Sequence, residues 1–366
     1  MKKVILMCLQ LGKIDLSPAR YQLLKELKNN NFITYLFLPK EKISEEVQSN
    51  IDYVIDTKDM SVNQIRKKIV QLHPNSVIAT TYEDTCILYI LPNILKATAF
   101  YYFNLEIYTK YYEVGLYNDA DIYKFIKWRI NYFLNKIKEV IFTRKSKLLV
   151  VQDSLRKRIL AKYHINHKNT ILVPNSYEYS GTNIVKCNSE GIVYSGGMWE
   201  VFLGDDIEHI CENKSVPITF IGNPPNRYVA SKLKKIQLRN SNIKVEKPLL
   251  SPKDYTEYLQ KFSVGLVLYS PSKDENLNYI GLSSGKFFKH LSLGQPVIVS
   301  DCPGLGREVR KYKLGVVISS LSDIETAYHI IMDNYTFYQR NIERVYKRKY
   351  DFGKVISPLI KSMRND

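Results

Sequence analysis

The sequence contains no apolar run that approaches the roughly 20 residues needed for a helix to span a bilayer. Its first apolar run, Val4–Leu9, is too short for a signal peptide and is typical of a buried strand. The five cysteines are dispersed and form no Cys-x-x-Cys pair, which argues against a disulfide framework or a zinc site and indicates a reducing compartment. We therefore expect a cytoplasmic protein, and 366 residues are enough for two domains.

Acidic residues are scarce relative to basic ones, with 36 Asp and Glu against 53 Lys and Arg, a net charge of +17. Between Lys124 and Lys168 the imbalance is largest: 13 basic residues face two acidic ones, Glu139 and Asp153, so this block carries 13 − 2 = +11. Such a block favours binding to a polyanionic partner: an acidic phospholipid, a phosphorylated lipid or a nucleic acid.

Short β-branched apolar runs alternate with stretches of helical periodicity along the whole chain. One helix is predicted over Pro18–Asn29, with Ser17 as its N-cap and Pro18 at its first position. The strands are continuously apolar, which predicts parallel sheets covered by helices on both faces. We predict strands over Lys3–Leu9, Phe32–Leu38, Tyr53–Ile55, Ser76–Ala79, Ala97–Phe103, Leu148–Val151, Thr170–Val173, Gly191–Ser195, Val216–Gly222, Ile243–Glu246, Val264–Tyr269, Pro296–Ser300 and Gly315–Ile318.

A polar segment without periodicity, Ser176–Ser189, divides these strands into two series. The pattern predicts an α/β fold of two doubly wound, Rossmann-like domains facing across a cleft, with ligand bound at the C-terminal ends of the strands. We expect an N-terminal domain over 1–176, a linker over 177–189, a C-terminal domain over 190–334, and terminal helices over 335–366.

The most informative stretch begins at Ser283, where Ser283, Ser284 and Gly285 open a short helix that ends at Gly294. Lys286 lies in its first turn. Helix N-termini offer unpaired N–H groups and the positive end of the helix dipole, which suits a diphosphate, and a lysine adds a full charge. The segment predicts an anion site at the carboxyl edge of a parallel sheet. The alternative is that a serine merely caps the helix and Lys286 is a solvated surface residue.

Several segments resemble, in the same order, the motifs of one enzyme family: the GT-B glycosyltransferases, specifically the family-4-like bacterial enzymes that build surface polysaccharides. The resemblance covers nearly the full length. It is carried by Ser17–Leu27 after a turn at Gly12, Leu149–Leu155, Ile171–Ser176, Gly191–Gly197, Ile221–Asn223, Lys247–Leu249, Lys286–Ser300 and Asp301–Glu308.

The sequence departs from this family at its usual pair of glutamates with E-x7-E spacing, whose places hold Gly281 and Lys289. The arginine and lysine usually found after the first strand of the C-terminal domain are absent as well. Lys286 is then the main cation available for the leaving diphosphate, with Lys289 or Lys247 as possible helpers.

The resemblance implies a metal-independent hexosyl- or related glycosyltransferase that needs no cofactor. It would move a sugar from a UDP- or GDP-sugar to a glycan or lipid-linked glycan hydroxyl, with retention of configuration. In the family, the terminal helices partly pack back on the N-terminal, acceptor-binding domain, and the C-terminal domain binds the nucleotide sugar. The donor residues that it implies are Gly12, Gly196, Gly222, Lys247, Asn278, Tyr279, Ser283, Ser284, Gly285 and Lys286.

Acceptor contacts are expected from Arg20, Glu83 and Asn104. Glu106 follows the predicted strand Ala97–Phe103 at the edge of the crevice and is a candidate base or sugar anchor, so we name it with Lys286 as catalytic. The alternative for Glu106 is a solvated loop carboxylate.

No metal site is expected. Asp119 and Asp121 match the metal-binding motif of GT-A enzymes. They immediately precede a long amphipathic helix, however, which favours a role in capping that helix. His164 and His167 lie in a basic segment without nearby carboxylates and are interpreted as surface residues.

Two other functions remain open from the sequence. A nucleotide-sugar 2-epimerase would use the same two-domain plan, but it would need several acid/base carboxylates and histidines at the cleft, and few are present here. A nucleic-acid-binding protein would use the basic block, although no nucleic-acid-binding motif is recognisable. A kinase or NTPase is disfavoured, since Phe287 stands where a Walker loop would place Ser or Thr.

The predicted helix Ile122–Ile141 is amphipathic and lies within the basic block. Its apolar face, which includes Ile126, Ile130, Phe133 and Ile137, is expected to pack in the core of the N-terminal domain. Its lysines would then point outward, together with Trp128 and Tyr132, toward an anionic bilayer. We therefore expect a cytoplasmic enzyme held peripherally on the inner face of the cell membrane; the alternative is that these lysines are merely solvated.

Overall fold

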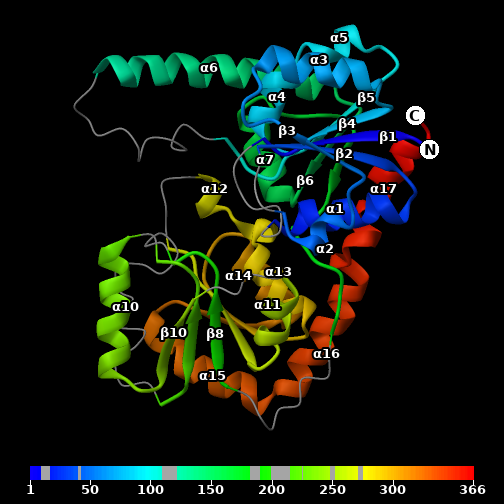
Figure 1. The fold of residues 1–366 in the computed structure, drawn as a ribbon. Coiled ribbons are helices and arrows are strands. Elements are labelled where there is room, and N and C mark those ends of the chain that lie inside the picture. Colours follow the sequence, from blue (N-terminus) through cyan, green and yellow to red (C-terminus); the bar gives the residue numbers. More distant parts are fainter. Residues whose placement is uncertain are drawn as a thin grey trace. The chain divides into compact units, whose positions relative to one another are not determined.

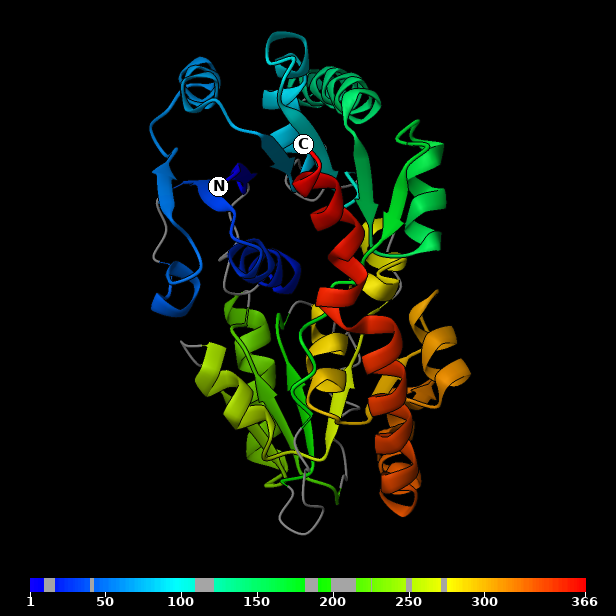
Figure 2. The ribbon, with the colours of Figure 1, turned by 90° about the vertical axis from the view of Figure 1, so that its right-hand side faces the viewer.

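The computed structural model describes residues 1–9, 17–39, 43–108, 122–181, 190–198, 215–224, 226–247, 252–270 and 275–366. The chain divides into two compact units (Figures 1 and 2). Unit 1 comprises residues 1–175 and 352–366, and unit 2 comprises residues 176–351. The predicted sites at Gly12, Asp119 and Asp121, and most of the predicted linker, lie outside the described residues.

The described residues of unit 1 form a seven-stranded parallel sheet in the order β3-β2-β1-β4-β5-β6-β7. Its strands are β1 Lys3–Met7, β2 Ile33–Leu38, β3 Tyr53–Asp56, β4 Ser76–Ala79, β5 Ala99–Phe103, β6 Leu148–Val151 and β7 Thr170–Leu172. Its helices are α1 Pro18–Asn29, α2 Glu45–Gln48, α3 Val62–Leu72, α4 Tyr82–Leu88, α5 Leu91–Ile94, α6 Ile122–Lys145, α7 Ser154–Lys162 and α17 Phe352–Arg364.

The described residues of unit 2 form a six-stranded parallel sheet in the order β10-β9-β8-β11-β12-β13. Its strands are β8 Ile192–Ser195, β9 Ile218–Ile221, β10 Ile243–Glu246, β11 Val264–Val267, β12 Val297–Ser300 and β13 Gly315–Ile318. Its helices are α10 Arg227–Arg239, α11 Pro252–Leu259, α12 Glu275–Asn278, α13 Gly285–Ser292, α14 Leu305–Tyr312, α15 Ile324–Asp333 and α16 Tyr335–Val345, the last continuing as a π-helical turn over Tyr346–Tyr350.

The two sheets confirm the predicted fold class of two doubly wound α/β units. Each of the predicted strands is present, with ends that differ by at most a few residues. The inner strands are buried along their whole length because helices cover both faces of each sheet. Helix α1 has the predicted bounds with Pro18 in its first turn, but the side chain of Ser17 makes no capping hydrogen bond.

The core of unit 1 includes a helix from the far end of the described sequence. Helix α17 contacts α1 (Figures 1 and 2). Its Phe352, Ile356 and Leu359 are buried in the same apolar cluster as Leu23 and Leu27 of α1. Helix α16 belongs instead to unit 2, so the chain passes between the units after residues 175 and 351.

The prediction for the face of α6 that packs in unit 1 was wrong. Ile126, Ile130, Phe133 and Ile137 are exposed, by 51%, 55%, 64% and 41%, whereas Trp128 is 8% exposed. The buried face supplies partners that an apolar face cannot: Trp128 stacks on Tyr132, which contacts Tyr108, and the buried Lys136 and Glu139 form an ion pair. Hydrophobic periodicity predicts an apolar stripe on a helix, but it does not predict which side of the helix packs against the domain.

None of the helices in the described residues is both long and apolar enough to cross a membrane.

Candidate functional site

The order of strands in unit 2 reverses between β8 and β11, whose C-terminal ends lie side by side. In doubly wound sheets, ligands bind outside the carboxyl ends of the strands at such a reversal. Tyr194 lies near the end of β8, while Leu268 and Tyr269 directly follow β11. The side chain of Lys286 reaches all three of these residues. The predicted anion-binding lysine therefore sits at the reversal point of the sheet.

The contacts of Lys286 hold its ammonium between two aromatic rings. Lys286 Nζ donates hydrogen bonds to the Tyr194 hydroxyl at 3.0 Å and to the Leu268 carbonyl at 3.4 Å. It lies 4.6 Å from the centroid of the Tyr194 ring and 4.5 Å from that of Tyr269. The residue as a whole remains partly exposed, but burial of the ammonium lowers the pKa of Lys286 to about 7. Near neutral pH this lysine gains or loses its charge easily, and an anion beside it would favour the charged form.

Helix α13 carries Lys286 in its first turn, as predicted from the sequence. Ser284 is its N-cap, since the Ser284 Oγ accepts a hydrogen bond from the Phe287 N–H at 3.2 Å. The same Oγ lies 2.7 Å from the Tyr269 hydroxyl. The capping alternative therefore holds for Ser284, whereas the alternative of a solvated Lys286 is wrong. Ser283 lies in the 3-10 turn that precedes the helix, and Gly285 is the first residue of the helix.

Two of the predicted donor glycines meet at the same edge of the sheet. Gly196 follows β8 with a φ of +127°, in the region that favours glycine, and Gly222 follows β9. A Cβ added to Gly222 would lie 2.1 Å from the carbonyl oxygen of Gly196. Position 222 therefore needs glycine for the two turns to approach each other, whereas position 196 needs glycine for its backbone conformation.

The other predicted donor residues of unit 2 are less closely engaged. Lys247 is exposed after β10. Asn278 and Tyr279 are half-buried at the end of α12. Lys289, a possible helper, is 8% exposed, donates to Thr256 Oγ1 at 2.6 Å and does not share the partners that are described for Lys286.

Sequence reasoning missed the two tyrosines that enclose Lys286. Both are apolar-strand residues by pattern, and the sequence gives no signal that distinguishes them from core aromatics. Their places at the carboxyl ends of β8 and β11, next to the reversal point, would have been the only pointer. His290 of the same helix as Lys286 is a neutral core residue, because burial lowers its pKa to about 4 and its Nδ1 lies 2.8 Å from Gln295 Oε1.

In unit 1 the strand order reverses between β1 and β4, and polar groups gather at that point as well. Asp84 Oδ2 accepts from the N–H groups of Thr80 and Thr81 at 2.8 and 2.9 Å, and its Oδ1 accepts from the N–H of Leu9 at 3.1 Å. Arg20 is 6% exposed and its Nε donates to Thr80 Oγ1 at 3.2 Å. Asp84 thus forms a capping box with Thr81 at the start of α4 and joins the ends of β1 and β4, and Arg20 is held against the same edge.

Glu83, in the first turn of α4, and Asn104, directly after β5, each have a buried oxygen without a hydrogen-bond partner among the described residues. These are Glu83 Oε2 and Asn104 Oδ1, and Gln152 Oε1 after β6 shares this property. Burial raises the pKa of Glu83 to about 7. Glu106 is half-buried in the loop after β5. Buried, unsatisfied hydrogen-bond acceptors therefore lie beyond three neighbouring strands, and Glu83 is able to exchange a proton near neutral pH.

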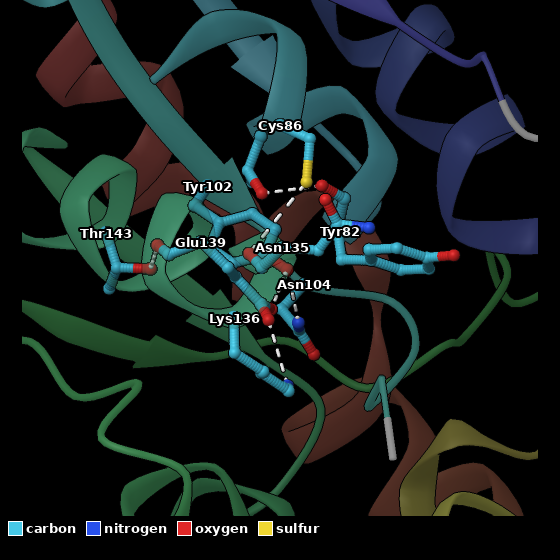
Figure 3. A network of polar contacts seen from close by, with 9 residues as sticks. Tyr82, Cys86, Tyr102, Asn104, Asn135, Lys136, Glu139 and Thr143 are labelled. Atoms are coloured by element: carbon cyan, nitrogen blue, oxygen red, sulfur yellow. Dashed lines mark hydrogen bonds and ion pairs between the residues drawn. The ribbon is translucent and has the colours of Figure 1, made fainter. Parts of the chain in front are cut away.

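A buried polar network fixes the position of Asn104 (Figure 3). Asn104 Nδ2 donates to the Tyr102 hydroxyl at 2.7 Å, and that hydroxyl donates to Glu139 Oε1 at 2.6 Å. Lys136 Nζ donates to Glu139 Oε2 at 2.9 Å. Because these side chains come from β5 and α6, the long helix is tied to the edge of the sheet that presents Asn104.

In the described part of the chain, no three His, Cys, Asp or Glu residues gather closely enough to hold a metal ion. His164 is exposed, and His167 Nδ1 lies 2.9 Å from the Asn169 carbonyl oxygen.

No protein-family model and no curated protein matches the chain. Solved structures do match it. The Anabaena protein Alr3699/HepE, in complex with UDP and glucose, matches over 100% of both chains with a TM-score of 0.71 and 9% identity. A glycosyltransferase from Rickettsia africae covers 100% of this chain and 98% of its own with a TM-score of 0.69 and 10% identity. The lipopolysaccharide outer core galactosyltransferase WaaB covers 99% and 100%, with a TM-score of 0.64 and 11% identity.

The chain has the GT-B fold. The predicted donor residues Lys286, Gly196 and Gly222 lie in the second unit. Arg20, Glu83, Asn104 and Glu106 lie in the first unit.

Proposed function

We propose that the protein is a glycosyltransferase that moves a sugar from a UDP- or GDP-sugar to a hydroxyl of a glycan or lipid-linked glycan. The observation that carries this proposal is the position of Lys286, in the first turn of α13 and over the reversal point between β8 and β11. The GT-B fold adds support, because HepE was solved with UDP and with UDP-glucose.

Lys286 and the N-terminus of α13 would stabilise the leaving diphosphate. Negative charge builds up on this group as the bond to the sugar breaks, so a preorganised cation and helix dipole stabilise the transition state more than the ground state. The Tyr194 and Tyr269 rings hold the ammonium in place before the donor arrives. This arrangement needs no metal ion, and we propose metal-independent transfer of a hexosyl or related group.

The glycines that follow β8 and β9, together with nearby loops of unit 2, would bind the rest of the donor. Gly196 and Gly222 allow backbone to approach the nucleotide closely, and Asn278 and Tyr279 are candidates for sugar contacts. Lys247 is a second cation for the phosphates.

The acceptor would bind at the strand ends of unit 1. Glu83 Oε2 and Asn104 Oδ1 are acceptors for its hydroxyl protons, and Arg20 positions the neighbouring strand ends through Thr80. With retention of configuration, a donor phosphate oxygen takes the acceptor proton. Glu83 and Glu106 are the carboxylates that would serve as base if configuration is inverted.

A thermal-shift panel of UDP, GDP, UDP-glucose and GDP-mannose tests the donor class. A ligand at about 100 times its Kd stabilises the folded state by about 2.7 kcal/mol, so a matched nucleotide gives a clear rise in Tm. Lys286→Met is expected to lower turnover of the matched donor by about a hundredfold, the typical effect of losing one such contact. Lys235→Met, at an exposed lysine of α10, is the matched control.

The outcome that contradicts the proposal is a folded wild-type protein that none of the four ligands stabilises. Equal turnover in wild type and Lys286→Met would be compatible with the proposed reaction, but it would show that Lys286 does not contribute to it.

We also propose that the enzyme works in the cytoplasm at the inner face of the cell membrane, where a lipid-linked acceptor would be presented. The net charge of +17 and its concentration in the block Lys124–Lys168 support an anionic surface as partner.

A further inference from the structure

Helix α6 exposes an unusual amount of apolar side chain for a helix of a folded domain. Seven large apolar residues of this helix are more than 40% exposed, and Figure 1 shows the helix extending away from the strands of its own unit. They are Tyr123 at 76%, Phe125 at 45%, Ile126 at 51%, Ile130 at 55%, Phe133 at 64%, Leu134 at 46% and Ile137 at 41%. Single exposed apolar residues are common, but a contiguous apolar patch marks an interaction surface.

Five of these residues form one stripe, because each lies three or four positions from another member of the set and all therefore share one face of the helix. They are Ile126, Ile130, Phe133, Leu134 and Ile137. The stripe runs over about three turns. We call it the α6 stripe.

The opposite side of the helix is anchored, so α6 cannot rotate to hide the stripe. Trp128 is 8% exposed and stacks on Tyr132. Farther along, Lys136 and Glu139 form a buried ion pair, and Phe142 is fully buried against Phe100 and Tyr102. Turning the stripe inward would expose these rings and break this ion pair, which is costly in a buried site. The orientation of the stripe is thus fixed by polar and aromatic contacts on the other face.

Among the described side chains of α6, the exposed charged ones are all positive. Lys127 and Arg129 are exposed on its two flanks, and Arg144 and Lys145 are exposed at the end of the helix. The acidic residue of α6, Glu139, is fully buried. A second copy of this helix would bring like charges together, whereas an anionic lipid surface offers opposite charge to the flanks and an apolar layer to the stripe.

The geometry points to α6 as an interfacial membrane helix that inserts the α6 stripe into the boundary of an anionic bilayer, while Lys127 and Arg129 pair with lipid phosphates. An amphipathic helix of this kind lies in the plane of the membrane, with its apolar face among the outer acyl segments. This reverses the orientation predicted from the sequence, in which the lysine face would have met the lipid. The inference deepens the membrane location within the proposed function and rests on that proposal, but it concerns lipid binding by α6 alone and not the transfer reaction.

Co-sedimentation of the full chain with vesicles tests it. We expect wild-type protein to bind vesicles of phosphatidylcholine and phosphatidylglycerol more strongly than vesicles of phosphatidylcholine alone. The double variant Ile130→Asp/Phe133→Asp is expected to weaken binding by about a hundredfold, since it replaces two inserting side chains by charges. Both positions are more than half exposed, so the fold should tolerate these changes. Leu238→Asp, at a 79% exposed position of α10 in unit 2, is the matched control and should bind like wild type.

A second pair of variants separates insertion from simple charge attraction. Lys127→Gln/Arg129→Gln should lose most of the preference for anionic lipid and most of the salt dependence of binding. Unchanged vesicle binding by Ile130→Asp/Phe133→Asp would overturn the inference, since the charges alone would then be responsible. Wild-type binding to neither type of vesicle would overturn it too.

Sedimentation velocity tests the alternative that a second copy of the chain, rather than a membrane, packs on the α6 stripe. A wild-type dimer that Ile130→Asp/Phe133→Asp converts to a monomer, without vesicle binding by wild type, would assign the stripe to a second copy and refute the membrane. Thermal shifts with UDP-glucose, measured in parallel on the same variants, report the proposed donor site. Loss of lipid binding with an unchanged UDP-glucose shift is therefore distinguishable from failure of the proposed function.

Discussion

Donor binding is expected to weaken as the pH rises through the neutral range, because Lys286 must be protonated to pair with a diphosphate. In the unliganded protein, burial between Tyr194 and Tyr269 lowers the pKa of this lysine to about 7, from an ordinary value of 10.5. A bound diphosphate places negative charge beside the ammonium and raises the pKa again. Binding above neutral pH is therefore coupled to the uptake of a proton.

The size of the effect follows from that coupling. If the pKa of Lys286 is about 7 in the free protein and lies above the tested range in the complex, the apparent Kd increases in proportion to 1 + 10^(pH − 7). From about pH 6.5 to about pH 8.5, Kd then rises about 25-fold. A nucleotide sugar is the right ligand, since its phosphates carry no ionisation in this range that would imitate the effect.

Titration calorimetry with UDP-glucose, or with whichever donor gives a thermal shift, measures Kd and proton uptake together. Lys286→Arg keeps its charge at every tested pH, so its Kd should be almost independent of pH. Lys286→Met should bind weakly and without pH dependence. A flat wild-type profile beside a weak Lys286→Met would show that the lysine stays charged throughout, and this would refute the argument from burial.

Three further results are expected. Gly222→Ala should lower both Tm and donor affinity. The Cβ of the alanine would lie 2.1 Å from the carbonyl oxygen of Gly196, so the turn after β8 or the turn after β9 would have to move. Differential scanning fluorimetry with and without nucleotide measures both effects. Glu139→Ala should reduce the free energy of unfolding in urea by about 3 to 5 kcal/mol, because it leaves Lys136 buried without its partner; a loss below about 1 kcal/mol would contradict this. The free energy of unfolding of wild type relative to that of Lys286→Met should rise between about pH 7 and 10.5, because over this range the unfolded chain binds a proton at Lys286 that the folded chain lacks; an unchanged difference would contradict this.

Much of the fold follows from local sequence, because a buried parallel strand is a short, continuous apolar run between polar segments. The strands of both sheets were predicted on this basis, for example Ile243–Glu246 and Gly315–Ile318 with unchanged ends. Lys286 was predictable in the same way, since its helix start is marked by serine and glycine and its position in the first turn is a matter of counting.

What the sequence did not predict depends on packing between distant segments. The enclosure of Lys286 by Tyr194 and Tyr269 brings together residues from β8, the segment after β11 and α13, and no local pattern distinguishes these tyrosines from others. The orientation of α6 was predicted wrongly because its apolar stripe suggests burial, whereas the ion pair of Lys136 and Glu139 decides which face turns inward.

The place of α17 in unit 1 has a consequence for the synthesis of the protein on the ribosome. Unit 1 buries Ile356 and Leu359 of α17 against Leu23 and Leu27 of α1, yet the 176 residues of unit 2, 176–351, are translated between the two segments of unit 1. At roughly 5 to 20 residues per second, the interval lasts on the order of ten to thirty seconds. During that time the apolar surface of α1 lacks its partner, while unit 2 has its own core and is able to fold first. The nascent chain therefore carries an uncovered hydrophobic face, which makes this interval the stage at which a chaperone would be needed most.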